Sequence, residues 1–167
     1  QDRHGRGTVF YDVWRYIKEA RPKVFVLENV KGLLTHNKGR TFDNILNMLE
    51  NIPNYEIHYK ILSPHTHANW PQHRPRVFIV GLRTDCVVGQ FHFPSEKKLE
   101  ILASDLINKS HIGSIDDLSD FEKRNLVSHQ TAIIKRDGVD IMNAYYFTDV
   151  NASAAFGKPM HEIVPAL

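Results

Sequence analysis

Cysteine is scarce in this sequence, with Cys86 the single thiol among 167 residues. One cysteine cannot form a disulfide within the chain, which excludes a disulfide-stabilised secreted scaffold and fits a reducing compartment. Long apolar runs are also missing. No stretch approaches the roughly 20 residues that a membrane-spanning helix needs, and no signal-peptide pattern opens the sequence. These absences predict a cytoplasmic protein.

Excess charge of one sign is small as well. The 21 Lys and Arg residues exceed the 19 Asp and Glu residues by only two, giving a net charge of +2. Such a balance permits a nucleic acid partner without requiring one. The hydrophobic content of 42% and charged content of 24% are ordinary for a globular domain. Because the first residue is Gln1 rather than Met, we expect the chain to be a portion of a longer protein.

The most informative stretch is the apolar segment of residues 24–30, Val-Phe-Val-Leu-Glu-Asn-Val. Four consecutive apolar residues after Pro22 predict a strand that is buried on both faces of a parallel sheet. Glu28 and Asn29 follow that apolar run. Open α/β sheets bind ligands at the carboxyl ends of their strands, so Glu28 is predicted to face a ligand.

Hydrophobic periodicity predicts the neighbouring elements. Helical spacing of apolar residues indicates helices over residues 8–20 and 41–52. Alternation over residues 55–61 indicates a strand with one polar face, and the apolar residues 77–82 indicate a buried strand with a possible antiparallel neighbour. Ser95 is placed to cap a further helix that carries leucines at positions 99, 102 and 106.

A second polar group precedes the strand predicted over residues 77–82. Gln72, Arg74 and Arg76 alternate along the chain there. Guanidinium groups bind phosphate oxygens and the carbonyl oxygens of bases, and a buried carboxyl can protonate a ring nitrogen when its pKa is raised. Each segment alone is a weak signal. Glu28 and the two arginines together predict a site that handles a nucleobase.

Three segments, in this order, resemble motifs V, VI and VIII of the DNA cytosine-5 methyltransferase family. They are residues 6–10 (Arg-Gly-Thr-Val-Phe), residues 22–32 (Pro-Lys-Val-Phe-Val-Leu-Glu-Asn-Val-Lys-Gly) and residues 71–81 (Pro-Gln-His-Arg-Pro-Arg-Val-Phe-Ile-Val-Gly). One departure is His4, where the family usually has an acid. The resemblance implies an α/β, partial Rossmann-like fold of S-adenosylmethionine-dependent methyltransferases, with a mixed sheet and flanking helices.

The family's chemistry implies a role for each polar residue. Its enzymes flip a cytosine out of duplex DNA and attack carbon 6 with a cysteine thiolate, so that carbon 5 can accept a methyl group from S-adenosylmethionine. By this resemblance Glu28 protonates N3 and holds the exocyclic amine, and Arg76 binds the base carbonyl O2. Arg74 would orient the catalytic loop or a phosphate. Asn29 and Gln72 would be supporting residues.

The resemblance also implies that Thr8 and Val9 line the methionine end of S-adenosylmethionine. The family's nucleophile lies in a Pro-Cys-Gln loop ahead of motif V, which this sequence does not contain. Cys86 lies beyond motif VIII and is rejected as the nucleophile, so the isolated chain is expected to be inactive. The spacing of His65 and His67 fits no standard zinc site, and no metal is expected.

These features predict two regions. Residues 1–88 would be the C-terminal half of the catalytic methyltransferase domain, and residues 89–167 a variable segment leading into the target-recognition region. The full protein is predicted to be a DNA (cytosine-5-)-methyltransferase of a restriction–modification system. It is expected to be a bacterial or phage protein that is cytoplasmic and nucleoid-associated. Its partners would be duplex DNA and a missing segment or separate chain that carries the cofactor loop and catalytic cysteine.

One alternative stays open. The chain could be a non-catalytic DNA-binding or regulatory subunit of a split or degenerate methyltransferase. It would then use Arg3, Arg6, Arg74 and Arg76 for phosphate contacts only.

Overall fold

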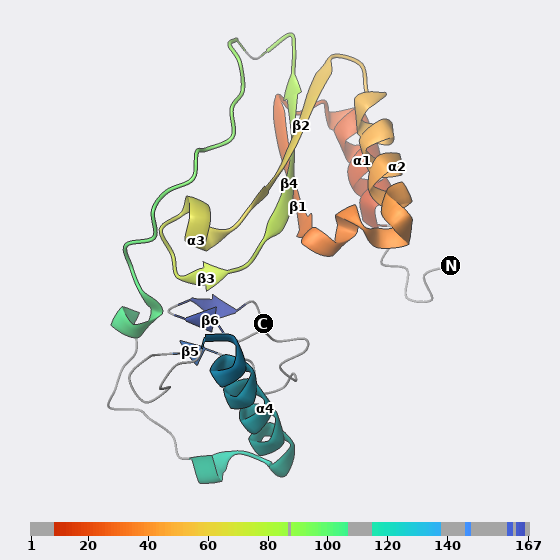
Figure 1. The fold of residues 1–167 in the computed structure, drawn as a ribbon. Coiled ribbons are helices and arrows are strands. Elements are labelled where there is room, and N and C mark those ends of the chain that lie inside the picture. Colours follow the sequence, from red (N-terminus) through yellow and green to blue (C-terminus); the bar gives the residue numbers. More distant parts are fainter. Residues whose placement is uncertain are drawn as a thin grey trace. The chain divides into compact units, whose positions relative to one another are not determined.

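Figure 1 shows the computed structural model, which describes residues 9–86, 88–106, 115–137, 146–147, 160–161 and 163–165. The chain divides into two compact units. Unit 1 comprises Gln1–Leu62 and Pro75–Pro94, and unit 2 comprises Ser63–Arg74 and Ser95–Leu167. The chain therefore leaves unit 1 after Leu62 and re-enters it at Pro75. None of the described helices combines the length and the apolar character that a transmembrane span requires.

Unit 1 is built on a three-stranded antiparallel sheet with the strand order β1-β4-β2. The strands are β1 (Val24–Val30), β2 (Tyr55–Leu62) and β4 (Arg76–Arg83). In the central strand β4, Arg76 lies opposite both Val30 of β1 and Leu62 of β2. The three strands predicted from periodicity are confirmed to within one residue at each end, and so is the antiparallel neighbour of the strand at 77–82.

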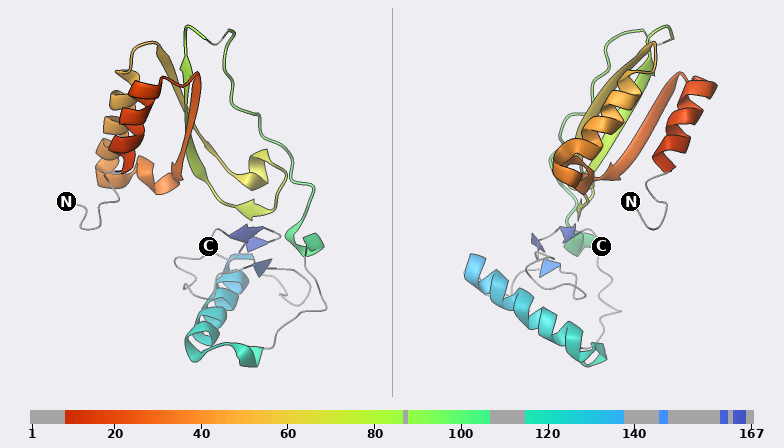
Figure 2. Two further views of the ribbon diagram at one scale, coloured as in Figure 1. Left: turned by 180° about the vertical axis from the view of Figure 1, so that it is seen from behind. Right: turned by 90° about the vertical axis from the view of Figure 1, so that its right-hand side faces the viewer.

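Two helices, α1 (Val9–Ala20) and α2 (Arg40–Glu50), lie on the same side of this sheet (Figure 2). They are linked by the indole of Trp14, which donates a hydrogen bond to the carbonyl oxygen of Met48 at 2.9 Å. Buried side chains of the helices, the strands and the turn after α2 form one core between the layers: Ile17, Phe25, Phe42, Leu49, Ile52, Tyr55, Val77 and Ile79. The predicted α/β class with flanking helices is therefore confirmed.

The exposure of β1 differs from the prediction. Phe25 is buried against the helices, but Val24, Val26 and Val30 are 47%, 58% and 52% exposed. Side chains alternate along a strand, so these valines and Glu28 share the face that points away from α1 and α2. The prediction of a strand buried on both faces in a parallel sheet is wrong for the described residues. Among these residues, helices cover only one face of β1, and its neighbour β4 runs antiparallel to it.

Two 3-10 helices connect β1 to α2. They are η2 (Lys31–Leu34) and η3 (His36–Gly39). Asn37 and Lys38 take left-handed φ angles of 53° and 61°, and Gly39 has a φ of 87° directly before α2. Glycine adopts that angle without the steric cost of a Cβ. The turn lets α2 run back over the sheet.

Unit 2 has little regular structure among its described residues. Its helices are α3 (Pro64–His67) and α4 (Asp120–Asp137), with 3-10 turns η4 (Ala103–Leu106) and η6 (Ile115–Asp117). Its strands have two residues each: β3 (Gln72–His73), β5 (Tyr146–Phe147), β6 (Met160–His161) and β7 (Val164–Pro165). β3 pairs in parallel with β7, and β5 pairs antiparallel with β6.

The helix predicted after Ser95 is wrong. Residues 95–100 have no regular structure, and only the 3-10 turn η4 follows. The reason is tertiary hydrogen bonding. The amide of Lys97 donates to the carbonyl oxygen of Thr66 at 2.7 Å, and the amide of Glu100 donates to Oδ1 of Asn69 at 2.7 Å. These donors therefore bind the segment around α3 instead of a helix of their own.

Candidate active site

Glu28 and Arg76 form an ion pair on the sheet face opposite the helices. The Nε of Arg76 lies 3.0 Å from Oε1 of Glu28. Arg76 lies across from Val30, two residues along β1 from Glu28, so the two side chains are diagonal neighbours on one face. The side chain of Arg76 is 16% exposed and that of Glu28 is 49% exposed. The pair thus presents a carboxylate to solvent beside a largely covered guanidinium.

A second bond fixes the guanidinium plane. Nη1 of Arg76 donates to the carbonyl oxygen of Pro75 at 3.1 Å. With Nε directed at Glu28 and Nη1 at the backbone, the side chain has one preferred orientation. A carboxylate and a fixed planar donor on one surface are suited to a planar heterocycle that has a protonatable nitrogen next to a carbonyl oxygen.

Arg74 and Gln72 lie in unit 2 and not in the unit that holds Glu28. The amide of Arg74 donates to Oγ of Ser63 at 3.0 Å. Gln72 belongs to β3, where it pairs with Val164, and its amide donates to the carbonyl oxygen of Trp70 at 2.7 Å. The structure therefore brings Glu28 and Arg76 together within unit 1 and gives Arg74 and Gln72 backbone anchors within unit 2.

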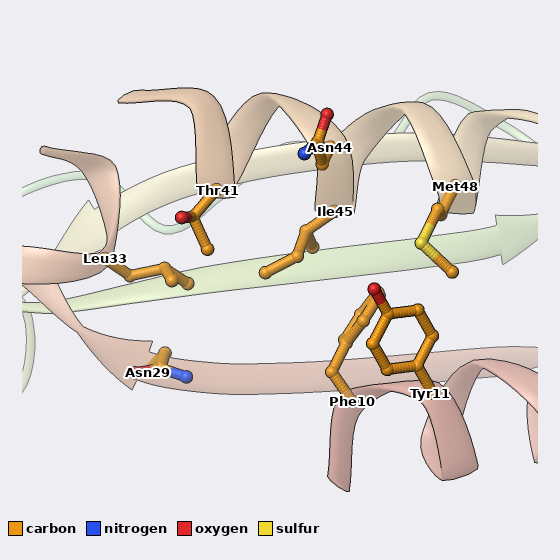
Figure 3. Close-up of a pocket in the computed structure, with 8 residues that line it drawn as sticks. All are labelled: Phe10, Tyr11, Asn29, Leu33, Thr41, Asn44, Ile45 and Met48. Carbon is orange, nitrogen blue, oxygen red and sulfur yellow. The ribbon is translucent and has the colours of Figure 1, made fainter. Parts of the chain in front are cut away.

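Asn29 faces the helices, away from the carboxylate of Glu28. It lines a cavity of about 370 Å³ between α1, α2 and the end of β1 (Figure 3). Its Oδ1 accepts the amide N–H of Val30 at 2.8 Å. The cavity has apolar walls from both helices and η2: Phe10, Leu33, Ile45 and Met48. The Asn29 side chain therefore stabilises the end of β1 by accepting a hydrogen bond from the backbone of the next residue.

The two residues predicted to touch the cofactor differ in status. Val9 is the first residue of α1 and is 60% exposed. Thr8 lies outside the described residues, as does His4. Within the described part of the chain, no three His, Cys, Asp or Glu side chains come close enough together to hold a metal ion.

Cys86 lies at the far end of the sheet from Glu28. Arg76 begins the eight-residue strand β4 and this turn follows its other end, roughly 20 Å or more away at about 3.3 Å per residue. Nη2 of Arg83 donates to Sγ of Cys86 at 2.7 Å, and this bond raises the pKa of Arg83 above its ordinary value. Burial raises the pKa of Asp85, but hydrogen bonds from Cys86 and Arg83 outweigh it and lower that pKa. Cys86 thus belongs to a polar cluster remote from the candidate site.

One residue was missed by the sequence reasoning. Ser63 is 7% exposed and directly precedes α3, and its hydroxyl accepts the amide of Arg74. A serine before a proline marks the start of a helix. That signal was available, but it indicates a cap for the helix rather than a contact with an arginine eleven positions away.

Comparison with known proteins decides the family. The family model of the C-5 cytosine-specific DNA methylases matches residues 2–148 of the chain. The chain belongs to this family. Membership in the C-5 cytosine-specific DNA methylases agrees with the resemblance carried by the three motifs.

Individual relatives of the methylase family support the same assignment. The chain is 44% identical over 107 residues to Type II methyltransferase M.SsoII of Shigella sonnei, which covers 63% of the chain and 28% of that protein. It is 35% identical over 154 residues to Type II methyltransferase M.DsaV of Dactylococcopsis salina, covering 92% of the chain and 42% of the relative. The chain thus spans less than half the length of these relatives.

Among solved structures, the Dnmt2 methyltransferase of S. pombe is similar with a TM-score of 0.47 and 16% sequence identity, over 81% of this chain and 41% of that chain.

Proposed function

We propose that the full protein is a DNA (cytosine-5-)-methyltransferase, which transfers a methyl group from S-adenosylmethionine to carbon 5 of a cytosine flipped out of duplex DNA. The observation that carries this proposal is the ion pair of Glu28 with Arg76, 3.0 Å apart on one face of the sheet. Family membership supports the reaction type.

Glu28 is proposed to act on N3 of the cytosine. Addition of a thiolate to carbon 6 moves electrons into the ring. Glu28, in its protonated carboxyl form, would deliver its proton to N3, which neutralises that charge and leaves a carboxylate beside Arg76. The other carboxyl oxygen would accept a hydrogen bond from the exocyclic amine. Arg76 is proposed to donate to O2, since its guanidinium is already held beside the carboxylate by Pro75.

S-adenosylmethionine supplies the methyl group when it is bound. The exposed Val9 side chain at the start of α1 fits an apolar contact with the methionine end of that cofactor, and Thr8 is proposed to lie beside it. Val9 would thus provide one apolar contact, and we propose that most cofactor contacts come from another part of the full protein.

The nucleophile and the cofactor loop are proposed to come from a missing segment or a separate chain. The 167 residues contain no Pro-Cys-Gln loop. The exposed valines at positions 24, 26 and 30 of β1 offer an apolar face that a further layer can cover. On this proposal residues 1–88 form the C-terminal half of the catalytic domain and residues 89–167 lead toward the target-recognition region, in a bacterial cytoplasm where the enzyme meets nucleoid DNA.

The test is Glu28→Gln in the full-length protein. Glutamine keeps the shape but cannot deliver a proton, so we expect the kcat of methyl transfer to duplex DNA to fall by roughly 100-fold or more. Binding of duplex DNA should be retained. Transfer of tritiated methyl groups and a DNA-binding titration measure the two quantities.

The matched control is Glu56→Gln. Glu56 is also a strand carboxylate beside a basic side chain, since its Oε1 lies 3.0 Å from Nε2 of His58. We expect this control to keep the wild-type kcat. Unchanged turnover in Glu28→Gln would refute the proton-donor role. Equal losses in both variants would also refute it, because they would show that removing any carboxylate from the sheet lowers kcat.

A further inference from the structure

Arg74 lies in the segment of residues 63–75, which connects strand β2 to strand β4 and is called the excursion below. The chain leaves β2 at Leu62 and returns to β4 at Arg76, and these two residues lie directly opposite each other in the sheet register. Between them come α3, an exposed turn at Trp70 and the short strand β3. The position of any side chain on this excursion depends on what closes its base.

Ser63, the first residue of the excursion, makes contacts with three parts of it. Its carbonyl oxygen accepts the amides of Thr66 and His67 at 3.1 and 3.0 Å, which begins α3. Its Oγ accepts the amide N–H of Arg74 at 3.0 Å and lies 2.8 Å from Nδ1 of His65. One buried hydroxyl therefore joins the beginning of the excursion to its end.

The hydroxyl of Ser63 does not cap the helix that follows it. Ser63 precedes the first residue of α3, where a serine side chain ordinarily accepts an amide of its own helix. Here the side chain makes no such capping bond. Its acceptor capacity is directed to Arg74 instead, which indicates that the hydroxyl serves the end of the excursion rather than the helix.

Arg74 is well placed to be controlled by this bond. The residue before a proline is confined to extended conformations, and Pro75 has no amide of its own. The N–H of Arg74 is thus the last backbone donor before Arg76. Holding it at Ser63 fixes the direction in which the Arg74 side chain leaves the backbone.

We infer that Ser63 is a positioning residue for Arg74, and that it acts by holding the Arg74 backbone so that the guanidinium meets the phosphate or the catalytic loop in one orientation. This inference rests on the proposed methyltransferase function. The consequence is that Ser63 affects turnover only through Arg74.

The experiment compares Ser63→Ala with Ser63→Thr in the full-length protein. Ser63→Ala should lower kcat by about 10- to 100-fold, as expected for a misplaced group, whereas Ser63→Thr keeps the hydroxyl and should restore most of it. In an Arg74→Ala background, Ser63→Ala should cause little further loss, because both changes remove one function. Hydrogen exchange of the Arg74 amide should become faster in Ser63→Ala alone and stay slow in Ser63→Thr.

The matched control is Ser119→Ala, which removes a serine whose hydroxyl does cap its own helix, α4. It should leave kcat at the wild-type value. An unchanged kcat in Ser63→Ala, or a full additional loss in the Arg74→Ala background, would overturn the inference. A wild-type protein without methyl transfer would instead refute the proposed function. In that case, hydrogen exchange of the Arg74 amide tests whether Ser63 positions Arg74. Protection of this amide that is unchanged by Ser63→Ala would reject the positioning role.

Discussion

At the scale of single residues, the ring of Phe25 packs directly against Gly81. The two residues lie opposite each other on β1 and β4. A Cβ built on Gly81 would overlap the ring atoms of Phe25. Gly81 is therefore required by the close approach of an aromatic ring that anchors β1 to the core.

Gly81→Ala should lower the free energy of unfolding by about 1–3 kcal/mol, because the added methyl group overpacks the core. Gly32→Ala is the matched control, since a Cβ there meets no atom within 4 Å. Phe25→Leu should make Gly81→Ala less costly by removing the ring. Urea unfolding measures all three. Equal effects of the two alanine variants would show that overlap with the Phe25 ring does not determine the cost.

The sequence predicted individual site residues only where they lie next to the apolar run of a strand. Glu28 follows an apolar run and Arg76 precedes one, and the antiparallel register makes them neighbours. Their roles in a site stay predictions. Ser63 was not found, because its partner Arg74 is reached through the path of the excursion. No local pattern in the sequence describes that path.

At the scale of elements, α4 begins with a capping box. The amide of Glu122 donates to Oγ of Ser119 at 3.3 Å, and the amide and hydroxyl of Ser119 donate to Oε2 of Glu122 at 2.8 and 2.6 Å. Bonds from the side chain and the backbone of Ser119 lower the pKa of Glu122 below its ordinary value. These reciprocal bonds satisfy amides that the first turn of a helix leaves without partners.

The stability of α4 should therefore decrease in acid. A carboxyl whose pKa is lowered in the folded state binds fewer protons than the unfolded chain. Its contribution is complete above the ordinary glutamate pKa of 4.5 and is lost as the pH falls through the folded-state pKa. Hydrogen exchange at the start of α4, followed from pH 6 to about pH 3, measures the loss. Glu122→Gln should remove this pH dependence. If the protection of these amides in the wild-type protein stays constant over this pH range, Glu122 does not stabilise the start of α4.

Elements of unit 1 follow their sequence patterns closely, and those of unit 2 do not. β1, β2 and β4 have long periodic patterns that packing against α1 and α2 reinforces. The segment after Ser95 has leucines at helical spacing, but its amides bind Thr66 and Asn69 of another segment. Local periodicity cannot register such a competing partner, which is why the predicted helix is absent there.

At the scale of the whole molecule, residues 1–167 alone should bind duplex DNA without methylating it. We expect binding that weakens steeply as salt rises, because phosphate contacts release counterions. Filter binding at several salt concentrations, with a parallel methyl-transfer assay, measures both properties. Absence of binding at low salt would count against the alternative of a DNA-binding subunit. Methyl transfer by the isolated chain would refute the need for a missing segment.

The strand order β1-β4-β2 also has a consequence for synthesis of the chain. Val30 at the end of β1 is 46 positions ahead of its partner Arg76 (76 − 30). At about 5–20 residues per second, a ribosome needs several seconds to make that interval. During this time the apolar edge of β1 has no β4 to pair with. The nascent chain therefore exposes an unpaired apolar strand to chaperones before unit 1 can close.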